Sequence, residues 1–150
     1  MNYNETINRI KTLMSGYNLE TITTYGDLYT FPGLKLELKE NNTKIGEVFL
    51  LDISVAINEE INVSQLHNKK LFNEEEMIYL YGLEIEPQYR GGGYGKKLMN
   101  ECLNSSSKMG YKKMSLMVNE TNQVARNLYT KKGFKYITEI DSSVFLEKIL

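Results

Sequence analysis

The chain has 150 residues, the size of one domain, and 41% of them are hydrophobic, which is enough to build a core. Its formal net charge of -1 gives no bulk electrostatic case for nucleic acid or a membrane surface as a partner. The single cysteine and single histidine exclude an internal disulfide framework and the ligand set of a typical zinc site, so we expect no metal.

The sequence also carries expectations about location. Residues 1–5 are polar and lack the apolar stretch of a secretory signal. No apolar run approaches the roughly 20 residues that a membrane helix needs. A lone cysteine, Cys102, suits a reducing compartment. We therefore expect a cytoplasmic protein.

The first half of the chain is only partly readable. Apolar residues at helical spacing, followed by Gly16, predict a helix over residues 4–15. Alternating leucines and charged residues over 34–39, a polar turn and a β-rich run over 45–57 predict a hairpin. Residues 17–33 are ambiguous, although 21–25 resemble a strand. Residues 58–76 are polar and are interpreted as a long excursion, in part helical.

The second half alternates strands and helices. Met77–Ile85 is an apolar, aromatic-rich run typical of a buried strand, and a proline ends it. The elements predicted after it are a helix from about Tyr94 to Met109, a strand over Lys113–Val118, a helix over Asn122–Lys132, and strands over Phe134–Ile140 and Val144–Ile149. The pattern predicts one domain of the α/β (or α+β) class that spans residues 1–150 and contains a mixed sheet.

A glycine-rich loop lies between the strand that ends at Ile85 and the helix that begins near Tyr94. The first N–H groups of a helix have no partners within the helix and lie at the positive end of its dipole. Glycines let a ligand approach the backbone without meeting a Cβ atom. Phosphate or pyrophosphate is therefore the expected guest.

Two common phosphate motifs fail here. A Walker A loop would match Gly95-Lys96, but Lys97 stands where the Mg²⁺-binding hydroxyl is needed, which argues against an ATPase or GTPase. The dinucleotide fingerprint would match Gly91 and Gly93 but requires a third glycine at Lys96.

What remains is Arg90-x-x-Gly93-x-Gly95 after a strand and a proline. This segment resembles the acyl-CoA signature of the GNAT N-acetyltransferase superfamily. A second block similar to the family follows in the expected order: Asn122-x-x-Ala125-x-x-x-Tyr129-x-x-x-Gly133-Phe134. The resemblance covers roughly residues 77–148, whereas residues 1–33 do not match the usual opening of the family.

The resemblance implies a mixed, mostly antiparallel central sheet with helices on both faces and a splayed strand pair, here 77–85 and 113–118. It implies acetyl-CoA as the acyl donor. The pyrophosphate would bind the backbone amides of Arg90, Gly91, Gly92, Gly93, Tyr94, Gly95 and Lys96. The main chain of Leu83 and Ile85 would pair with the pantetheine arm like an added strand.

Helical spacing places Asn122, Ala125 and Tyr129 on one face of the second helix, a polar stripe that suits a cofactor wall. By the resemblance, Asn122 contacts the pantetheine or pyrophosphate, and the Tyr129 hydroxyl lies near the CoA sulfur. A phenol there can protonate the departing thiolate as a general acid. The competing interpretation is a core tyrosine packed on the sheet.

The base is less determined. The resemblance favours a Glu or His on the strand before the loop, and Glu84 is the candidate. In a regular strand Tyr79 and Tyr81 share one face and Glu84 points the other way, whereas a bulge would reset that alternation. We expect Tyr79 and Tyr81 to line the acceptor pocket. His67 is interpreted as a surface residue and Cys102 as core.

The function predicted is an acetyl-CoA-dependent N-acetyltransferase acting on a primary amine of a small molecule or a protein. The alternatives are a non-catalytic acyl-CoA-binding module on the same fold and, from a different class, a nucleotide hydrolase. Homodimers are common among similar proteins, so the resemblance allows one.

Overall fold

The computed structural model describes residues 19–23, 33–40, 42–52 and 76–150. The strands are β1 (Leu19–Thr23), β2 (Gly33–Glu40), β3 (Thr43–Asp52), β4 (Met77–Ile85), β5 (Lys113–Asn119), β6 (Lys135–Ile140) and β7 (Ser143–Ile149). The helices are the short 3-10 helix η2 (Pro87–Tyr89), α3 (Tyr94–Lys108) and α4 (Gln123–Lys131). The predicted helix over 4–15 and His67 lie outside the described residues, as does the excursion over 58–76 except for Glu76.

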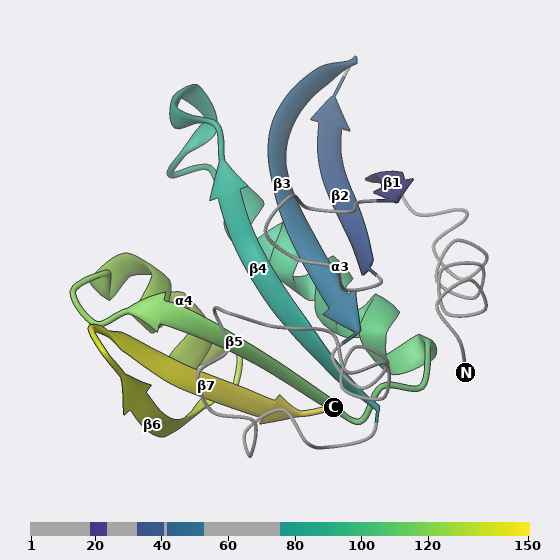
Figure 1. The fold of residues 1–150 in the computed structure, drawn as a ribbon. Coiled ribbons are helices and arrows are strands. Elements are labelled where there is room, and N and C mark those ends of the chain that lie inside the picture. The colour runs from purple at the N-terminus through teal and green to yellow at the C-terminus, as the bar shows by residue number, and fades with distance from the viewer. Residues whose placement is uncertain (1–18, 24–32, 41, 53–75) are drawn as a thin grey trace.

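The described strands form one seven-stranded sheet in the order β1-β2-β3-β4-β5-β7-β6. Among these neighbours only β4 and β5 run parallel, and every other pair is antiparallel. Parallel neighbours need a crossover, and α3 supplies it (Figure 1). The predicted mixed, mostly antiparallel sheet is confirmed.

Both α3 and α4 lie on the same face of the sheet. Their buried side chains belong to one core cluster with the inward residues of the strands. The helices also contact each other, since the Lys132 Nζ donates to the Asn100 Oδ1 at 2.7 Å. None of the helices that the structure describes is long and apolar enough to cross a membrane.

The core follows strand periodicity. Successive side chains of a strand point to opposite faces, so every second residue meets the helices. The helix-facing residues of the strands include Leu36, Val48, Leu50, Ile78, Leu80, Met114, Leu116, Val118, Val144 and Leu146. Cys102 of α3 is fully buried among them, as predicted.

The predicted boundaries agree well in the second half of the chain. β4 has the predicted limits, and α3, β5, α4, β6 and β7 agree to within a residue or two, which is the usual spread at element ends. The hairpin is also present as β2 and β3. β3 ends at Asp52, earlier than the predicted run to residue 57, and residues 53–57 lie outside the described part.

Candidate functional site

The site is organised by the separation of β4 from β5. The two strands pair from Met77 opposite Lys113 to Leu80 opposite Leu116, and the register ends there. Beyond this point they diverge, which Figure 1 shows as a V between the ends of β4 and β5. The predicted splayed pair is therefore present, and it opens two strand edges in the middle of the sheet.

A β-bulge turns β4 where the V begins. Tyr81 pairs with Phe49 and Glu84 with Glu47, so two residues of β4 stand opposite one residue of β3. Gly82 lies in this stretch with φ +66°, a conformation that glycine adopts without strain. A bulge bends its strand and increases its twist, which is consistent with the departure of β4 from β5.

The bulge decides the orientation of Glu84. Because cross-strand partners share a face, Glu84 lies on the same face as Tyr79 and Tyr81. The alternation of a regular strand, which would have turned Glu84 away, does not hold here. The Glu84 side chain is well exposed at the rim of the V.

The glycine loop closes one end of the V. Gly91 and Gly93 have φ of +83° and +84°, and Gly93 is the N-cap of α3. No side chain caps the helix, so the first-turn amides are not used by a capping residue. A Cβ atom built on Gly91 or Gly93 meets nothing within 4 Å. The backbone here presents uncapped N–H groups beside open space.

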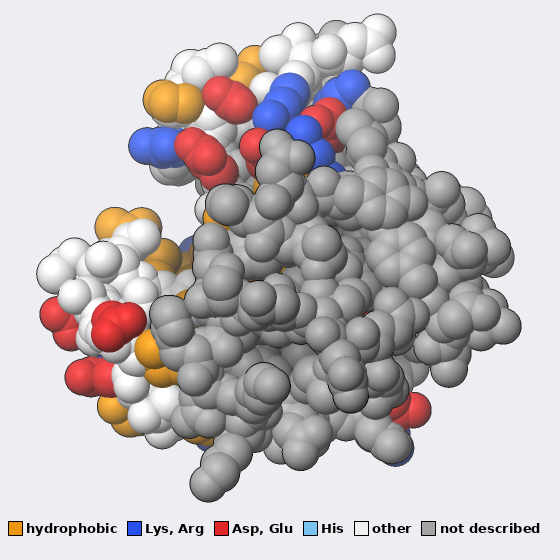
Figure 2. All heavy atoms as spheres, in the orientation of Figure 1, with side chains coloured by type: hydrophobic (Ala, Val, Ile, Leu, Met, Phe, Trp, Pro, Cys, Tyr) orange, Lys and Arg blue, Asp and Glu red, His pale blue; other side chains and the backbone are white. Residues whose placement is uncertain are grey.

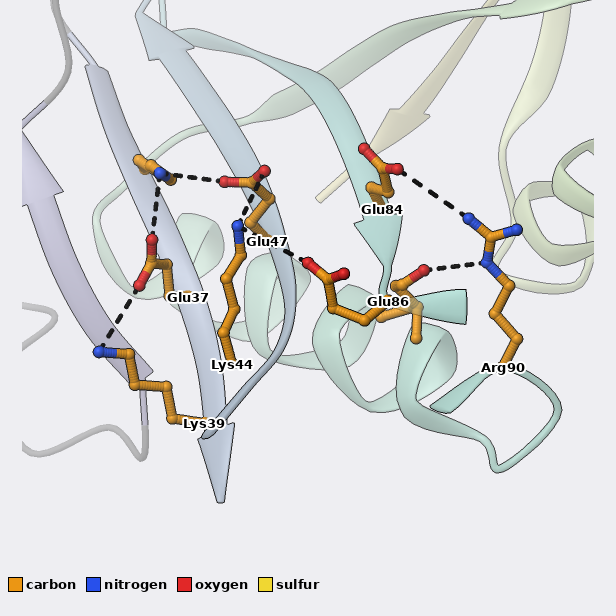
Figure 3. A network of polar contacts seen from close by, with 9 residues as sticks. Glu37, Lys39, Lys44, Glu47, Glu84, Glu86 and Arg90 are labelled. Carbon is orange, nitrogen blue, oxygen red and sulfur yellow. Dashed lines mark hydrogen bonds and ion pairs between the residues drawn. The ribbon is translucent and has the colours of Figure 1, made fainter. Parts of the chain in front are cut away.

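The Arg90 side chain folds back from the loop onto β4. Its Nε donates to the Ile85 carbonyl at 2.9 Å, and a terminal nitrogen lies 4.0 Å from Glu84. Figure 3 shows this guanidinium reaching toward Glu84. One carbonyl of the splayed strand is therefore already bonded within the chain.

The same view shows further charge pairs on β2 and β3 and after β4. Lys44 pairs with Glu47 at 3.2 Å and lies 3.9 Å from Glu86, and Lys39 lies 3.7 Å from Glu37 (Figure 3). These pairs are partly exposed, where an ion pair is worth at most about 1 kcal/mol.

The other wall of the V is α4. Asn122 is its N-cap, and the Asn122 Oδ1 accepts from the Ala125 backbone N–H at 3.2 Å. Tyr129 is buried near the end of the helix and packs edge-on against Phe134, with ring centroids 5.8 Å apart. Burial, together with neighbouring Cys102, raises the pKa of Tyr129 to about 12. The phenol therefore stays protonated at neutral pH.

These walls enclose a cavity of about 510 Å³. β4 contributes Leu83, Glu84 and Ile85. The loop and α3 contribute Tyr89, Arg90, Gly91, Gly93, Tyr94 and Gly95. α4 contributes Asn122, Val124, Ala125, Leu128 and Tyr129. Figure 2 shows a recess between the upper and left-hand lobes of the molecule, where the V opens.

The sequence comparison decides the family. The profile of the Acetyltransferase (GNAT) family matches residues 33–134. This range includes β4, the loop, α3 and α4. The chain belongs to the GNAT acetyltransferase family. The resemblance stated from the sequence is thereby confirmed.

Two curated GNAT relatives match part of the chain. An uncharacterized N-acetyltransferase, YycN, of Bacillus subtilis (strain 168) is 44% identical over 62 residues, 41% of this chain and 38% of that protein. A [ribosomal protein bS18]-alanine N-acetyltransferase of Haemophilus ducreyi is 34% identical over 59 residues, 39% of this chain and 41% of that protein. The match thus spans about two fifths of each relative.

Solved GNAT structures share the fold. The crystal structure of the PaiA N-acetyltransferase from Thermoplasma acidophilum, in complex with coenzyme A, superposes with a TM-score of 0.60 at 20% identity. The match covers 98% of this chain and 70% of that chain. At this identity the likeness supports the fold.

Most of the residues predicted for the GNAT site line one cavity, but four do not. Gly92 and Lys96 belong to the loop and α3 but not to the lining. Tyr79 is buried, and Tyr81 is partly exposed with its ring 5.9 Å from that of Phe49; neither lines the cavity. Among the described residues, no cluster of three potential metal ligands is found.

The prediction missed three lining residues, Tyr89, Val124 and Leu128. Val124 and Leu128 lie four residues apart on α4, so their side chains lie on the same face of the helix. The signal was the exposed Val124 beside a polar stripe, since a large apolar residue on the outside of an amphipathic helix suggests a ligand.

Proposed function

We propose that this GNAT protein transfers the acetyl group of acetyl-CoA to a primary amine of a small molecule or a protein. The proposal rests mainly on the cavity, which is lined at one end by the uncapped N-terminus of α3 and at the other by the buried, protonated Tyr129. One end suits phosphates and the other suits a leaving thiolate.

The loop supports binding of the CoA pyrophosphate. Open space beside Gly91 and Gly93 leaves room for phosphate oxygens at the backbone, and the helix dipole favours negative charge there. The exposed edge of β4 offers main-chain groups to the pantetheine arm. Because the Ile85 carbonyl is bonded to Arg90, we assign this pairing first to Leu83 and to the Ile85 N–H.

The residues of the cavity support direct transfer. Glu84, directly or through water, takes a proton from the amine, whose nitrogen forms the new C–N bond at the acetyl carbonyl carbon. As the C–S bond breaks, Tyr129 gives its proton to the sulfur and regains one from solvent. The products are the N-acetylated amine and the free thiol of CoA.

A cysteine-linked intermediate has no support. Cys102 is fully buried and does not line the cavity, and burial raises the pKa of its thiol far above the usual range. A neutral, enclosed thiol cannot serve as the nucleophile, so the amine attacks the thioester itself.

The name of the relative that acts on a ribosomal-protein alanine makes a protein N-terminal amine one acceptor to test. A single domain over 1–150 is supported by the continuous seven-stranded sheet of the described residues. Cytoplasmic location and a homodimer stay predictions.

The test is release of CoA thiol from acetyl-CoA with a panel of polyamines, aminoglycosides, amino acids and peptides that begin with alanine. Release with any amine, and N-acetylation by mass spectrometry, support the proposal. Binding of acetyl-CoA without transfer to any amine favours the non-catalytic module. Mg²⁺-dependent ATP binding without CoA binding would overturn the proposal of acetyl transfer in favour of a nucleotide hydrolase.

The role of Tyr129 is tested by Tyr129→Phe. We expect kcat to fall about 100-fold, within the usual range for loss of a general acid. CoA affinity should change little. Tyr136→Phe, on exposed β6 outside the cavity, is the matched control. Full turnover by Tyr129→Phe would remove Tyr129 from the reaction.

A further inference from the structure

An aromatic pair lies on the face of the sheet that turns away from the helices. Leu50 and Leu80 pair across β3 and β4 and belong to the core beneath α3 and α4. The next cross-strand pair is Phe49 and Tyr81, so strand alternation turns these two side chains to the opposite face. Their ring centroids lie 5.9 Å apart. Tyr81 is 37% exposed and Phe49 is half-buried, which leaves ring surface for a ligand.

The aromatic pair lies where the V begins. Leu80 is the last residue of β4 that pairs with β5, and Tyr81 follows it directly. Gly82 comes next, and a Cβ atom built there would lie 3.1 Å from the Phe49 ring. Because Gly82 has no side chain, this ring can lie against the backbone of the bulge. The pair therefore borders the opening of the V on the face opposite the helices.

Glu84 connects this face with the cavity. It lines the cavity, which α3 and α4 enclose from the other side. Through its pairing with Glu47 it also shares the face of Phe49 and Tyr81, and its side chain is 67% exposed. The acceptor nitrogen must reach Glu84 if this carboxylate is the base. An amine that arrives from the face opposite the helices then passes the aromatic pair.

The charged side chains near the pair are balanced. Each carboxylate labelled in Figure 3 has a lysine or arginine nitrogen within 4.0 Å. The carboxylates are those of Glu37, Glu47, Glu84 and Glu86, and the cations beside them are Lys35, Lys39, Lys44 and Arg90. With one cation for each carboxylate, this group of described residues has no net negative charge to hold a second ammonium group. A polyamine thus has no electrostatic advantage here over a monoamine.

We propose that Phe49 and Tyr81 select acceptors whose primary amine lies next to an aromatic or other large apolar group, in preference to polycationic amines. The inference rests on the proposed function, because it requires Glu84 as the base and the thioester in the cavity. The apolar group of the acceptor packs against the exposed part of the Tyr81 ring, and its amine points along β4 toward Glu84. Aromatic groups bury a large apolar area and favour edge-on or offset contact with another ring.

The test compares acceptors that carry the same primary amine with and without a ring. Phenethylamine and ethylamine differ by a phenyl group, whereas spermidine adds further cations. With acetyl-CoA as donor, kcat/KM of the native protein for phenethylamine should exceed that for ethylamine at least about tenfold, since a buried ring removes much apolar area from water. The value for spermidine should stay within about threefold of that for ethylamine.

Three variants assign the preference to the Tyr81 ring. Tyr81→Thr, whose β-branched side chain suits a strand, should bring the phenethylamine-to-ethylamine ratio to within about threefold of unity. Tyr81→Phe keeps the ring, so the ratio should stay within about twofold of the native value. Tyr136→Thr removes a tyrosine that is 57% exposed on β6 and should leave the ratio unchanged. Acetyl-CoA affinity, measured by calorimetry, should change less than about twofold in each variant, because neither tyrosine lines the cavity.

Binding to protein saturated with CoA separates recognition from transfer, because CoA carries no acetyl group. Phenethylamine should bind this complex at least about tenfold more tightly than ethylamine, and Tyr81→Thr should remove the difference. The same calorimetric ratio is available even without turnover.

The outcomes distinguish this inference from the proposed function. Equal use of phenethylamine and ethylamine by native protein, a preference for spermidine, or an unchanged ratio in folded Tyr81→Thr contradicts the aromatic selection and leaves acetyl transfer intact. Native protein that binds acetyl-CoA but transfers to no amine contradicts the proposed function, and binding to the CoA complex then still decides whether the aromatic pair recognises an apolar amine.

Discussion

The two halves of β4 have opposite surroundings although they are continuous in sequence. From Met77 to Leu80 the strand is buried and pairs with β5, and from Ile78 onward it pairs with β3 as well. From Tyr81 to Ile85 it keeps β3 as a neighbour, loses β5, and exposes its side chains. The first half resembles the interior of a parallel sheet, and the second half resembles an edge strand.

The difference shows how one strand serves stability and binding at once. The paired half contributes apolar burial, the main favourable term in folding. The splayed half lacks the pairing with β5 next to a cavity, which costs stability unless a side chain, a ligand or water satisfies the main-chain groups on that side. Substitutions in the two halves should therefore have separable effects.

The largest effect is expected at Leu80, in the paired half. Leu80→Ala removes a buried side chain and should cost about 2–5 kcal/mol of unfolding free energy, measured by urea denaturation. Leu83→Ala, in the splayed half, removes a half-buried side chain and should cost less than about half as much. Equal losses would contradict the division of β4 into two halves.

Alkaline pH probes the wall opposite the splayed half. The pKa of Tyr129 is raised from 10.0 to about 12 in the folded state, so its contribution to stability is complete below pH 10 and is lost as pH rises through 12. Native protein should lose roughly 2 kcal/mol more than Tyr129→Phe across this window. Parallel curves for the two proteins would show that Tyr129 is not protected by burial.

Gly82 tests the junction between the halves. In Gly82→Ala a side chain enters the left-handed region at φ +66°, and its Cβ lies 3.1 Å from the Phe49 ring. We expect a loss of about 1–2 kcal/mol, detected as a lower melting temperature. Gly95→Ala is the control, because its Cβ meets only ordinary contacts at 3.9 Å and alanine favours a helix. A Gly82→Ala protein as stable as the native one would mean that the bulge tolerates any residue.

Gly93 tests the mouth of the open half. Gly93→Ala strains the backbone at φ +84° and turns the loop amides away from a bound phosphate, so CoA affinity should fall about tenfold by calorimetry. Gly92→Ala has no positive φ, and its Cβ meets the movable Tyr94 ring at 3.2 Å. Its effect should be less than about threefold. A larger loss in Gly92→Ala than in Gly93→Ala would remove the argument for the loop.

The smallest effect on stability is expected at the rim. Glu84→Gln removes an exposed carboxylate whose partner Arg90 lies 4.0 Å away, so unfolding free energy should change by less than about 0.5 kcal/mol. The same variant should lower transfer to an amine at least about tenfold. Transfer at the native rate would show that Glu84 is not the base.

The second half of the fold could be predicted because its signals are local. The apolar run of β4, the proline and glycines after it, and the helical spacing of α3 and α4 each lie within a short segment. Glycines, helix starts and apolar periodicity act through neighbouring backbone atoms, so they can be read from one chain.

The orientation of Glu84 could not be derived the same way. It depends on the register between β3 and β4, which only the paired strands define. Gly82 within an apolar strand was a signal of a bulge, although it does not give the direction of the shift. The burial of Tyr79 could not be read from the sequence for a related reason, since it depends on β5 and on the point where pairing stops.

The V also has a consequence for folding and storage of the protein. Two unpaired strand edges in the middle of a sheet are templates for pairing with another chain, the route by which β-proteins aggregate. A pantetheine arm along these edges would cover them, and a ligand that binds only the folded state also raises its stability by mass action. The proposed ligand acetyl-CoA should therefore also act as a folding aid, slowing aggregation during refolding in proportion to the fraction of protein that binds it.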